Sequence, residues 1–476
     1  MDYVYPLHFL DDLKLNRMPV HWLLHFNDIL DAQKLREALT KLLGIGDWRK
    51  LGGRLRSKGK GRLEIHVPSR WTFDRPAFAY YHETLSQSLS EHRLAGSLGT
   101  RPNGPCTQPL AHALQTLMTV PGTPTRFKEW VDRDVPLLSV RITSFADATL
   151  VAFSWPHSLM DASGARAFLQ AWSFVVAGKE SHLPPLLGSH EDVLMEALRD
   201  NLESEKRQEL ALERWRLKGR NKLEFMLRLV GGLSSNIQPE VRRIYIPNDA
   251  IKRLKAQAKE EIKEEAETGA FVTENSVLTA WLTRIVAMSE SKPRPITQLS
   301  TMNARFRLQQ VKRDALYVQN MILPSYTFLP ASISRGSVGQ LALEQQHQMK
   351  ERASEQQTLA ILERYHSLYH SGRDPLLSLL VGKKEAGLVV FNNLTKVGVI
   401  QATDFGAAVL TLGNKQSMDR GGNAPGTPIN FVVHTEPEKL VSFVCITGKD
   451  HAGNYWLIAN LKPRTWLRLE EELHLL

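Results

Sequence analysis

The feature that most constrains the fold is a nearly continuous apolar run at residues 149–155, which reads Thr-Leu-Val-Ala-Phe-Ser-Trp. Such runs are typical of a central strand that is buried on both faces of its sheet. Before it, residues 85–109 are rich in Ser, Gly and Pro and predict a long loop, and residues 138–143 alternate like a half-buried strand. After it, residues 168–175 place Phe, Leu, Trp and Val on one helical face. This order predicts an α/β fold.

The length of the chain indicates two domains. It has 476 residues, of which 42% are hydrophobic, and this is enough for two domains that each bury a core. Charged helical segments follow Pro184-Pro185, and Gly231-Gly232 interrupts them. We therefore predict an N-terminal domain at 1–183, a crossover linker at 184–240 and a C-terminal domain at 241–476.

The charge balance is basic without the pattern of a nucleic-acid-binding protein. Lys and Arg number 60 against 50 Asp and Glu, and the pI is near 9.4. The densest basic stretch, residues 54–62, contains no interleaved aromatic side chains, and no zinc-finger or phosphate-loop spacing occurs. We expect no nucleic-acid partner. A mildly basic surface explains the excess, and a small ligand that carries phosphates would also suit it.

Membrane, secretory and metal signals are also missing from the sequence. No apolar run approaches the ~20 residues needed to cross a bilayer, and the first residues lack a basic segment followed by an apolar one. Cys106 and Cys445 alone form neither a disulfide framework nor a zinc site. His366 and His370 lie at i, i+4 spacing without a third ligand, so we expect a solvated helix face and no metal site. These patterns predict a cytoplasmic globular protein.

The segment that carries chemistry is His157-Ser-Leu-Met-Asp161, directly after the buried strand. An imidazole at the end of a central strand can face a crevice, and its ordinary pKa near 6.5 lets it accept a proton at physiological pH. Asp161 can either bond the ring or hold the loop through an arginine. The same spacing recurs at His8 and Asp12, but we interpret that instance as structural because it lies near a terminus and lacks a preceding buried strand.

Further motifs extend the pattern over nearly the whole chain in a consistent order. They are Leu10-Asp11-Asp12, Gly52-Gly53-Arg54-Leu55, Glu274 to Trp281, Thr301 to Arg307, Asp404-Phe405-Gly406 and Gly453 to Leu457. Together with His157-x-x-x-Asp161 and Gly164, this set resembles the BAHD acyltransferases, the acyl-CoA-dependent transferases of specialised metabolism. It is most similar to fungal branches such as the trichothecene acetyltransferase-like proteins.

The resemblance implies a fold and a reaction. The fold would be two similar-sized chloramphenicol-acetyltransferase-like domains of mixed β-sheet flanked by helices, with a tunnel between them. His157 would be the general base that activates a hydroxyl, or less readily an amine, of a small-molecule acceptor. The transferred acyl group, for which acetyl is the first expectation, would come from acyl-CoA in a ternary complex. We expect no bound cofactor, no metal and no covalent acyl-enzyme. We expect a monomer.

The resemblance also implies roles for other residues. Asp161 would pair with Arg305, or alternatively Arg307, to hold the catalytic loop, and Gly164 would belong to the same loop. Asp404, Phe405 and Gly406 would be scaffold; relatives commonly pair this aspartate with an arginine. Ser276, Asn392 and Asn393 would contact CoA. The oxyanion donor stays open between Ser163, a backbone N–H near Ala407, and Asn393.

The sequence departs from the family pattern at three places. Ala407-Ala408 replaces the Trp-Gly that follows Asp-Phe-Gly, Ala162 replaces the glycine after the motif aspartate, and Asn392-Asn393-Leu394 replaces a Thr-Ser-Trp element. These departures keep alternative functions open. The first is a cofactor-free isomerase or cyclase that reuses the scaffold with His157 as base, and the second is a binding protein without catalysis. A condensation domain of a peptide synthetase is the third, but its signature has a second His where this chain has Pro156.

Overall fold

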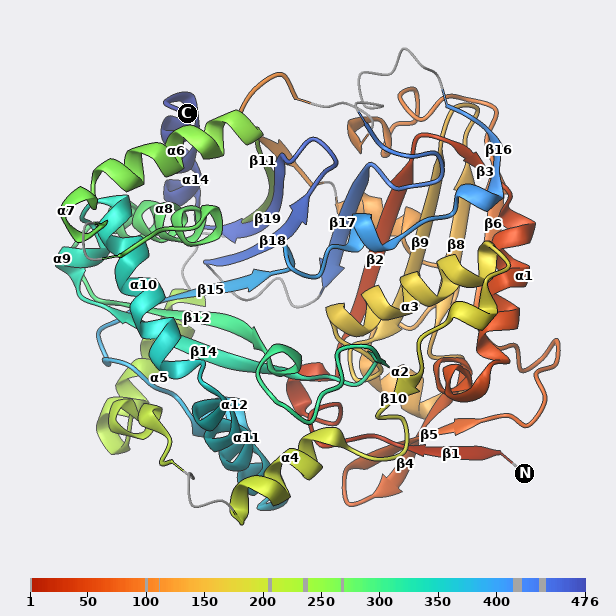
Figure 1. The fold of residues 1–476 in the computed structure, drawn as a ribbon, viewed down its shortest axis with the longest axis horizontal. Coiled ribbons are helices and arrows are strands. Elements are labelled where there is room, and N and C mark those ends of the chain that lie inside the picture. Colours follow the sequence, from red (N-terminus) through yellow and green to blue (C-terminus); the bar gives the residue numbers. More distant parts are fainter. Residues whose placement is uncertain are drawn as a thin grey trace.

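The computed structural model describes residues 2–98, 102–110, 112–203, 208–233, 239–266, 269–413, 422–435 and 442–476. Two mixed sheets form its framework, and they lie side by side in Figure 1. The five-stranded sheet has the order β17 (Asn430–Thr435), β2 (Pro19–Phe26), β9 (Thr149–Pro156), β8 (Ser139–Ser144) and β6 (Ala79–Thr84). The seven-stranded sheet has the order β14 (Ile322–Leu329), β12 (Ile296–Asn303), β15 (Gly387–Asn393), β18 (Phe443–Lys449), β19 (Tyr455–Leu461), β11 (Glu240–Ile246) and β7 (Cys106–Pro109).

Helices cover the outer faces of both sheets. In Figure 1, α1 (Ala32–Leu43) and α3 (Ala162–Val176) lie over the five-stranded sheet at the right. Over the seven-stranded sheet at the left lie α6 (Asn248–Glu260), α8 (Glu274–Ser289), α10 (Val338–Arg352) and α14 (Pro463–His474). Each helical layer buries its own hydrophobic cluster against its sheet. The α/β fold class is therefore confirmed.

The predicted central strand is present as β9, in which all eight residues are buried. It pairs with β2 on one side and β8 on the other, both antiparallel. Val151, Phe153 and Trp155 point into the cluster under α1 and α3, together with Phe168 and Trp172 of α3. The alternating strand predicted at 138–143 is β8, shifted by one residue. This packing fixes the position of the end of β9, and His157 is the next residue in the chain.

Each sheet contains a strand from the opposite part of the chain. β17, from the C-terminal part, pairs antiparallel with β2. In return β7, from the N-terminal part, pairs antiparallel with β11, so that Cys106 lies opposite Tyr245. The expected loop at 85–109 is thus wrong at its end, because residues 106–109 find an open sheet edge that local composition does not reveal. The boundaries 1–183, 184–240 and 241–476 stay predictions.

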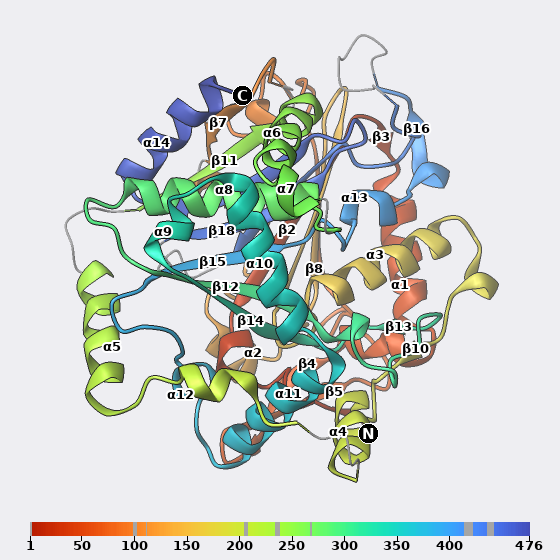
Figure 2. The ribbon, with the colours of Figure 1, turned by 60° about the vertical axis from the view of Figure 1, so that its left-hand side comes forward.

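Smaller elements join the two layers. The short sheets are β1 (Tyr3–Pro6) with β5 (Arg62–Val67) and β4 (Arg54–Gly59), β10 (Leu186–Leu187) with β13 (Leu316–Tyr317), and β16 (Val409–Thr411) with β3 (Ile29–Leu30). The remaining helices are α2 (Phe127–Asp132), α4 (Val193–Leu202), α5 (Gly219–Leu233), α7 (Lys263–Ala266), α9 (Ala331–Ser334), α11 (Glu355–His370), α12 (Pro375–Ser378) and α13 (Val399–Ala402). Figure 2 shows α5, α4 and α11 at the periphery. Within the described ranges, no helix combines the length and apolarity that a membrane span needs.

Candidate active site

His157 follows β9 directly, and its backbone is held from both sides. Its N–H donates to the carbonyl of Met18 at 2.8 Å, and its own carbonyl accepts from Asn320 Nδ2 at 2.9 Å. The residue keeps partial exposure, whereas its Nδ1 atom is buried and has no hydrogen-bond partner within the described part of the chain. The end of a rigid strand therefore presents an imidazole whose Nδ1 side faces the protein.

The environment of the ring keeps it uncharged. Burial lowers the pKa of His157 below its ordinary value, while the nearby carboxylates of Asp161 and Asp11 act in the opposite direction. Since the lowering by burial is the largest effect, the neutral imidazole is the main form at neutral pH. A neutral imidazole is the form that can accept a proton.

Asp161 holds the catalytic loop through three bonds, with no bond to the ring. Its Oδ1 accepts from the Gly164 N–H at 2.9 Å and so caps the first turn of α3. Its Oδ2 accepts from Arg305 Nη1 at 2.7 Å and from the Met321 N–H at 2.9 Å. The ion pair is almost completely buried. Arg307, the other option for the pair, is exposed.

Gly164 is required by a close approach of the chain. A Cβ atom at this position would lie 2.5 Å from the Val318 carbonyl oxygen and 2.9 Å from Met160 Cβ. The segment 316–321 therefore lies directly against the first turn of α3. It carries the Gln319 carbonyl that accepts from Arg305 Nη2 at 2.5 Å, so that Arg305 bridges this segment and Asp161.

Asn320 is a site residue that the sequence reasoning missed. It is buried, and it reaches both the His157 carbonyl and the carboxylate of Asp11. The available signal was a pair of amides, Gln319-Asn320, directly before the apolar start of β14. Buried side-chain amides need hydrogen-bond partners, so two neighbouring amides directly before an apolar strand indicate a polar contact within the fold.

The three residues predicted to contact CoA lie at the carboxyl end of β15 and in the first turn of α8. Asn392 and Asn393 end β15, where Asn392 Oδ1 accepts from Thr301 Oγ1 at 3.1 Å and Asn393 Nδ2 donates to Asn275 Oδ1 at 2.5 Å. Ser276 follows Asn275 in the first turn of α8, and its Oγ accepts from Gln346 Nε2 at 2.6 Å. Asn393 and Ser276 thus lie at the N-terminus of α8, whereas Asn392 is on the opposite face of the sheet beside Thr301.

A further contact connects the end of β12 to the catalytic loop. Asn303, at the end of β12, donates from Nδ2 to Ser163 Oγ at 2.8 Å. Ser163 lies in the first turn of α3, between Asp161 and Gly164 in sequence. Polar side chains therefore extend from the N-terminus of α8, by way of β15 and β12, to α3.

Phe405, in the Asp404-Phe405-Gly406 segment, lies in the core under α3. Phe405 is fully buried, stacked against Phe26 at 5.5 Å between ring centroids and packed on Trp172 at 4.9 Å. Asp404 is exposed, and its Oδ1 accepts from the Gly406 N–H at 2.8 Å. No arginine of the described chain pairs with Asp404. The carboxylate therefore caps a local turn, and the arginine pair that the resemblance implied is not found in the described chain.

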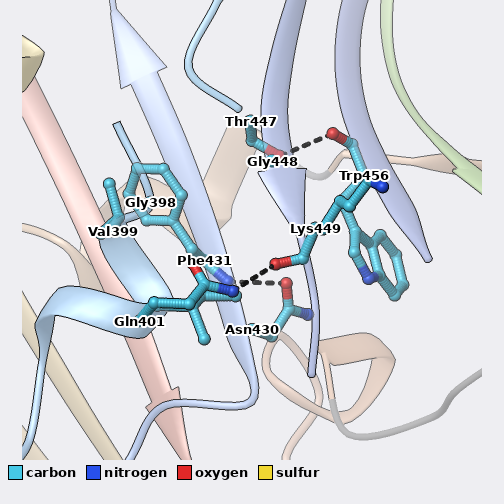
Figure 3. Close-up of a pocket in the computed structure, with 10 residues that line it drawn as sticks. Gly398, Val399, Gln401, Asn430, Phe431, Thr447, Gly448, Lys449 and Trp456 are labelled. Carbon is cyan, nitrogen blue, oxygen red and sulfur yellow. Dashed lines mark hydrogen bonds between the residues drawn. The ribbon is translucent and has the colours of Figure 1, made fainter. Parts of the chain in front are cut away.

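A small pocket lies elsewhere, between α13 and strands of both sheets (Figure 3). Its lining residues are Gly398, Val399, Ile400, Gln401, Asn430, Phe431, Thr447, Gly448, Lys449 and Trp456. Gln401 Nε2 donates to the Lys449 carbonyl at 3.3 Å across it. None of the site residues named above lines this pocket.

Metal-binding geometry is not found in the part of the chain that the structure describes. No three His, Cys, Asp or Glu side chains converge there. The rings of His366 and His370 are 4.2 Å apart, and the His366 ring packs edge-on against Phe9. This pair therefore belongs to an aromatic contact between α11 and the N-terminal segment.

Comparison with known proteins identifies the class. The chain is 30% identical to the acetyltransferase pyiB of Pyricularia grisea over 99% of this chain and 93% of that protein. It is 31% identical to the O-acetyltransferase PaAT-2 of Phomopsis amygdali over 99% of this chain and 98% of that protein. The F. sporotrichioides TRI101 structure with coenzyme A and T-2 has the same fold, with a TM-score of 0.67 at 14% identity over 99% and 98% of the two chains.

The family model named Transferase family matches residues 123–407. The fold and these matches define an acyltransferase. The chain belongs to the Transferase family, as a BAHD-type member of its fungal branch, and it is an acyl-CoA-dependent O-acyltransferase.

Proposed function

We propose that this O-acyltransferase moves an acetyl group from acetyl-CoA to a hydroxyl of a specialised-metabolite acceptor, with His157 as the general base. The observation that carries the proposal is the His157 ring itself, with its Nδ1 atom buried and its pKa lowered by burial. The names of the relatives support acetyl as the acyl group and a hydroxyl as the acceptor.

The proposed reaction is a direct transfer within a ternary complex. The neutral ring takes the proton of the acceptor hydroxyl as its oxygen attacks the thioester carbonyl, and base catalysis of this kind contributes about 10²–10⁴-fold. The tetrahedral intermediate then collapses, the C–S bond breaks, and the imidazolium returns its proton to the CoA thiolate. Asp161 and Arg305 keep the loop in register without entering the reaction.

Ser163 is the oxyanion donor that the contacts favour among the three options. Its Oγ accepts from Asn303 Nδ2, so its own O–H stays available to donate to a developing negative charge. It is partly exposed and belongs to the catalytic loop. Ala407 instead lies against α1, where its carbonyl accepts from Lys34 Nζ. Asn393 donates to Asn275 and is already engaged.

CoA would follow the polar side chains that lead from the N-terminus of α8 to α3. In this proposal Ser276, Asn392 and Asn393 contact the donor, which is a co-substrate, and no resident cofactor is needed. The thioester would then arrive beside Ser163, in the first turn of α3 that follows the His157 loop. The tunnel between the two sheets, the monomeric state, the cytoplasmic location and the small-molecule alcohol as sole further partner stay predictions that accompany this proposal.

The test is turnover of acetyl-CoA with a panel of alcohols, read as CoA release, for the wild-type protein and His157→Ala. We expect turnover for the wild-type protein and its loss in the variant, with an unchanged thermal melt. Incubation with acetyl-CoA alone should leave the intact mass unchanged, because the ternary mechanism forms no acyl-enzyme. A stable acyl adduct would reject this mechanism, and normal turnover by His157→Ala would reject His157 as the base.

A further inference from the structure

The second His-x-x-x-Asp segment, residues 8–12, contains a carboxylate that the mechanism above does not use. Asp11 is completely buried. Its Oδ1 accepts from the backbone N–H of Asn320 at 2.7 Å and from Asn320 Nδ2 at 2.8 Å, and its Oδ2 accepts from the His8 N–H at 3.3 Å. Burial raises the pKa of Asp11, while Lys50, His8 and the bonds from Asn320 lower it and so favour the carboxylate. The three donors fix the position of this enclosed group.

Asn320 joins this carboxylate to the catalytic loop. Its Nδ2 carries two hydrogens, one directed to Asp11 Oδ1 and the other to the His157 carbonyl. A flipped amide would direct its oxygen at two acceptors, so the carboxylate permits only one orientation. The neighbouring Met321 N–H donates to Asp161. Residues 320 and 321 therefore connect two separate carboxylates to the same loop.

Asp11 has a buried cation near it. Lys50, from the turn at 46–52, is completely buried, and its Nζ has no hydrogen-bond partner in the described chain. The charged groups that face Lys50 are the carboxylates of Asp11, Asp192 and Asp47. Burial lowers the pKa of Lys50 because an enclosed ammonium group without a direct partner is costly, and the three carboxylates oppose this effect and favour the charged form.

We propose that Asp11 is a positioning residue for acyl transfer, with Lys50 as its buried counter-ion. Asp11 orients Asn320, which fixes the backbone of His157, and its negative charge stabilises the imidazolium that forms when His157 takes the acceptor's proton. The proposal rests on the proposed function of His157 as base. Asp11 would thus act through Asn320 and through its field, without contact to either substrate.

The charged groups around the ring allow a test by pH. The carboxylates that face His157 are Asp161 and Asp11, and both raise its pKa against the effect of burial. Asp161 is paired directly with Arg305, whereas Lys50 makes no direct bond. Removal of the Asp11 charge therefore favours the neutral ring and lowers the pKa of His157. The acidic limb of the kcat/KM profile should move to lower pH.

Asp11→Asn keeps the volume and removes the charge, and Asp12→Asn is its matched control. Asp12 lies in the same turn but pairs with Arg17 at 2.6 Å and Tyr369 Oη at 2.8 Å, away from Asn320. For Asp11→Asn we expect kcat to fall about 10-fold, because a misplaced base loses rate steeply. KM for acetyl-CoA should stay constant while the acidic limb shifts. Asp12→Asn should lower the thermal midpoint and leave the limb in place.

The double variant Asp11→Asn/Lys50→Met separates positioning from stability. It removes both buried charges, so its thermal midpoint should return towards that of the wild-type protein while kcat and the shifted limb stay those of Asp11→Asn. Where Asp11→Asn alone gives too little folded protein, the double variant carries the test. A limb that coincides with the wild-type profile, or a full return of kcat, would overturn the proposal. An active His157→Ala would reject the proposed function instead.

Discussion

Residues 8–12 and 157–161 share one spacing, but their contacts differ. His8 is buried with its Nε2 2.8 Å from the Gly188 carbonyl, which therefore accepts the Nε2 proton. His157 is partly exposed, and its buried Nδ1 has no hydrogen-bond partner of this kind in the described structure. His8 thus has its Nε2 proton committed to the fold, and His157 has a nitrogen available for chemistry. The comparison teaches that the strand before the motif, more than the spacing, decides its role.

The largest expected effect tests that comparison directly through His157→Ala and His8→Ala. The first variant should lose about 1000-fold in kcat, which corresponds to about 4 kcal/mol of barrier, at an unchanged thermal midpoint. The second should keep kcat within about 3-fold and lose stability, because a buried side chain and its bond to Gly188 disappear. Steady-state kinetics and thermal unfolding of both measure this. A reversal of the two patterns would contradict the assignment.

The next effect concerns Arg305, which joins the catalytic loop at Asp161 to the segment 316–321. Arg305→Ala leaves the buried Asp161 carboxylate without its cation, which typically costs about 3 kcal/mol or more of unfolding free energy. Arg305→Lys keeps the charge but lacks the planar fork that reaches both Asp161 and the Gln319 carbonyl. We expect urea unfolding to rank stability as wild type, then Lys, then Ala. Equal stability of all three would show that the pair does not hold the loop.

A smaller effect is expected at the proposed oxyanion donor. Ser163→Ala should lower kcat about 30-fold, about 2 kcal/mol, because one hydroxyl donor to the tetrahedral intermediate is lost. KM for acetyl-CoA should change little. Asn303→Asp is a useful partner variant, since it removes the amide donor to Ser163 Oγ. A normal kcat in Ser163→Ala would leave the backbone N–H groups of the loop as the donors.

The sequence predicted the parts of the site that are local in the chain. The buried strand β9, the histidine after it and the capped start of α3 all lie within 149–176, where hydrophobic pattern and capping chemistry act at short range. The pairing of Asp161 with Arg305 needed the family resemblance, because 144 residues separate the two.

Other features could not be predicted from the sequence. β7 gives no local signal, because four residues in an edge position gain their stability from β11. Asn320 and Lys50 are ordinary polar residues in the sequence, and their burial follows from how residues 8–12, 46–52 and 316–321 pack together. The altered Asp404 environment likewise depends on which arginines reach it in three dimensions.

Gly164 gives the last and smallest effect, and it tests how closely 316–321 must lie against α3. Gly164→Ala places a Cβ 2.5 Å from the Val318 carbonyl oxygen, and backbone cannot yield as a flexible side chain can. Overpacking of this kind costs about 1–3 kcal/mol. The displaced segment carries Asn320 and Met321, so kcat should fall more than KM for acetyl-CoA rises. Ala162→Gly, in the same helical turn, adds no atom and should cost less than about 1 kcal/mol. If Gly164→Ala matches the wild-type protein in urea unfolding and in kcat, contact between the two segments does not position His157, and its own strand alone determines where the ring lies.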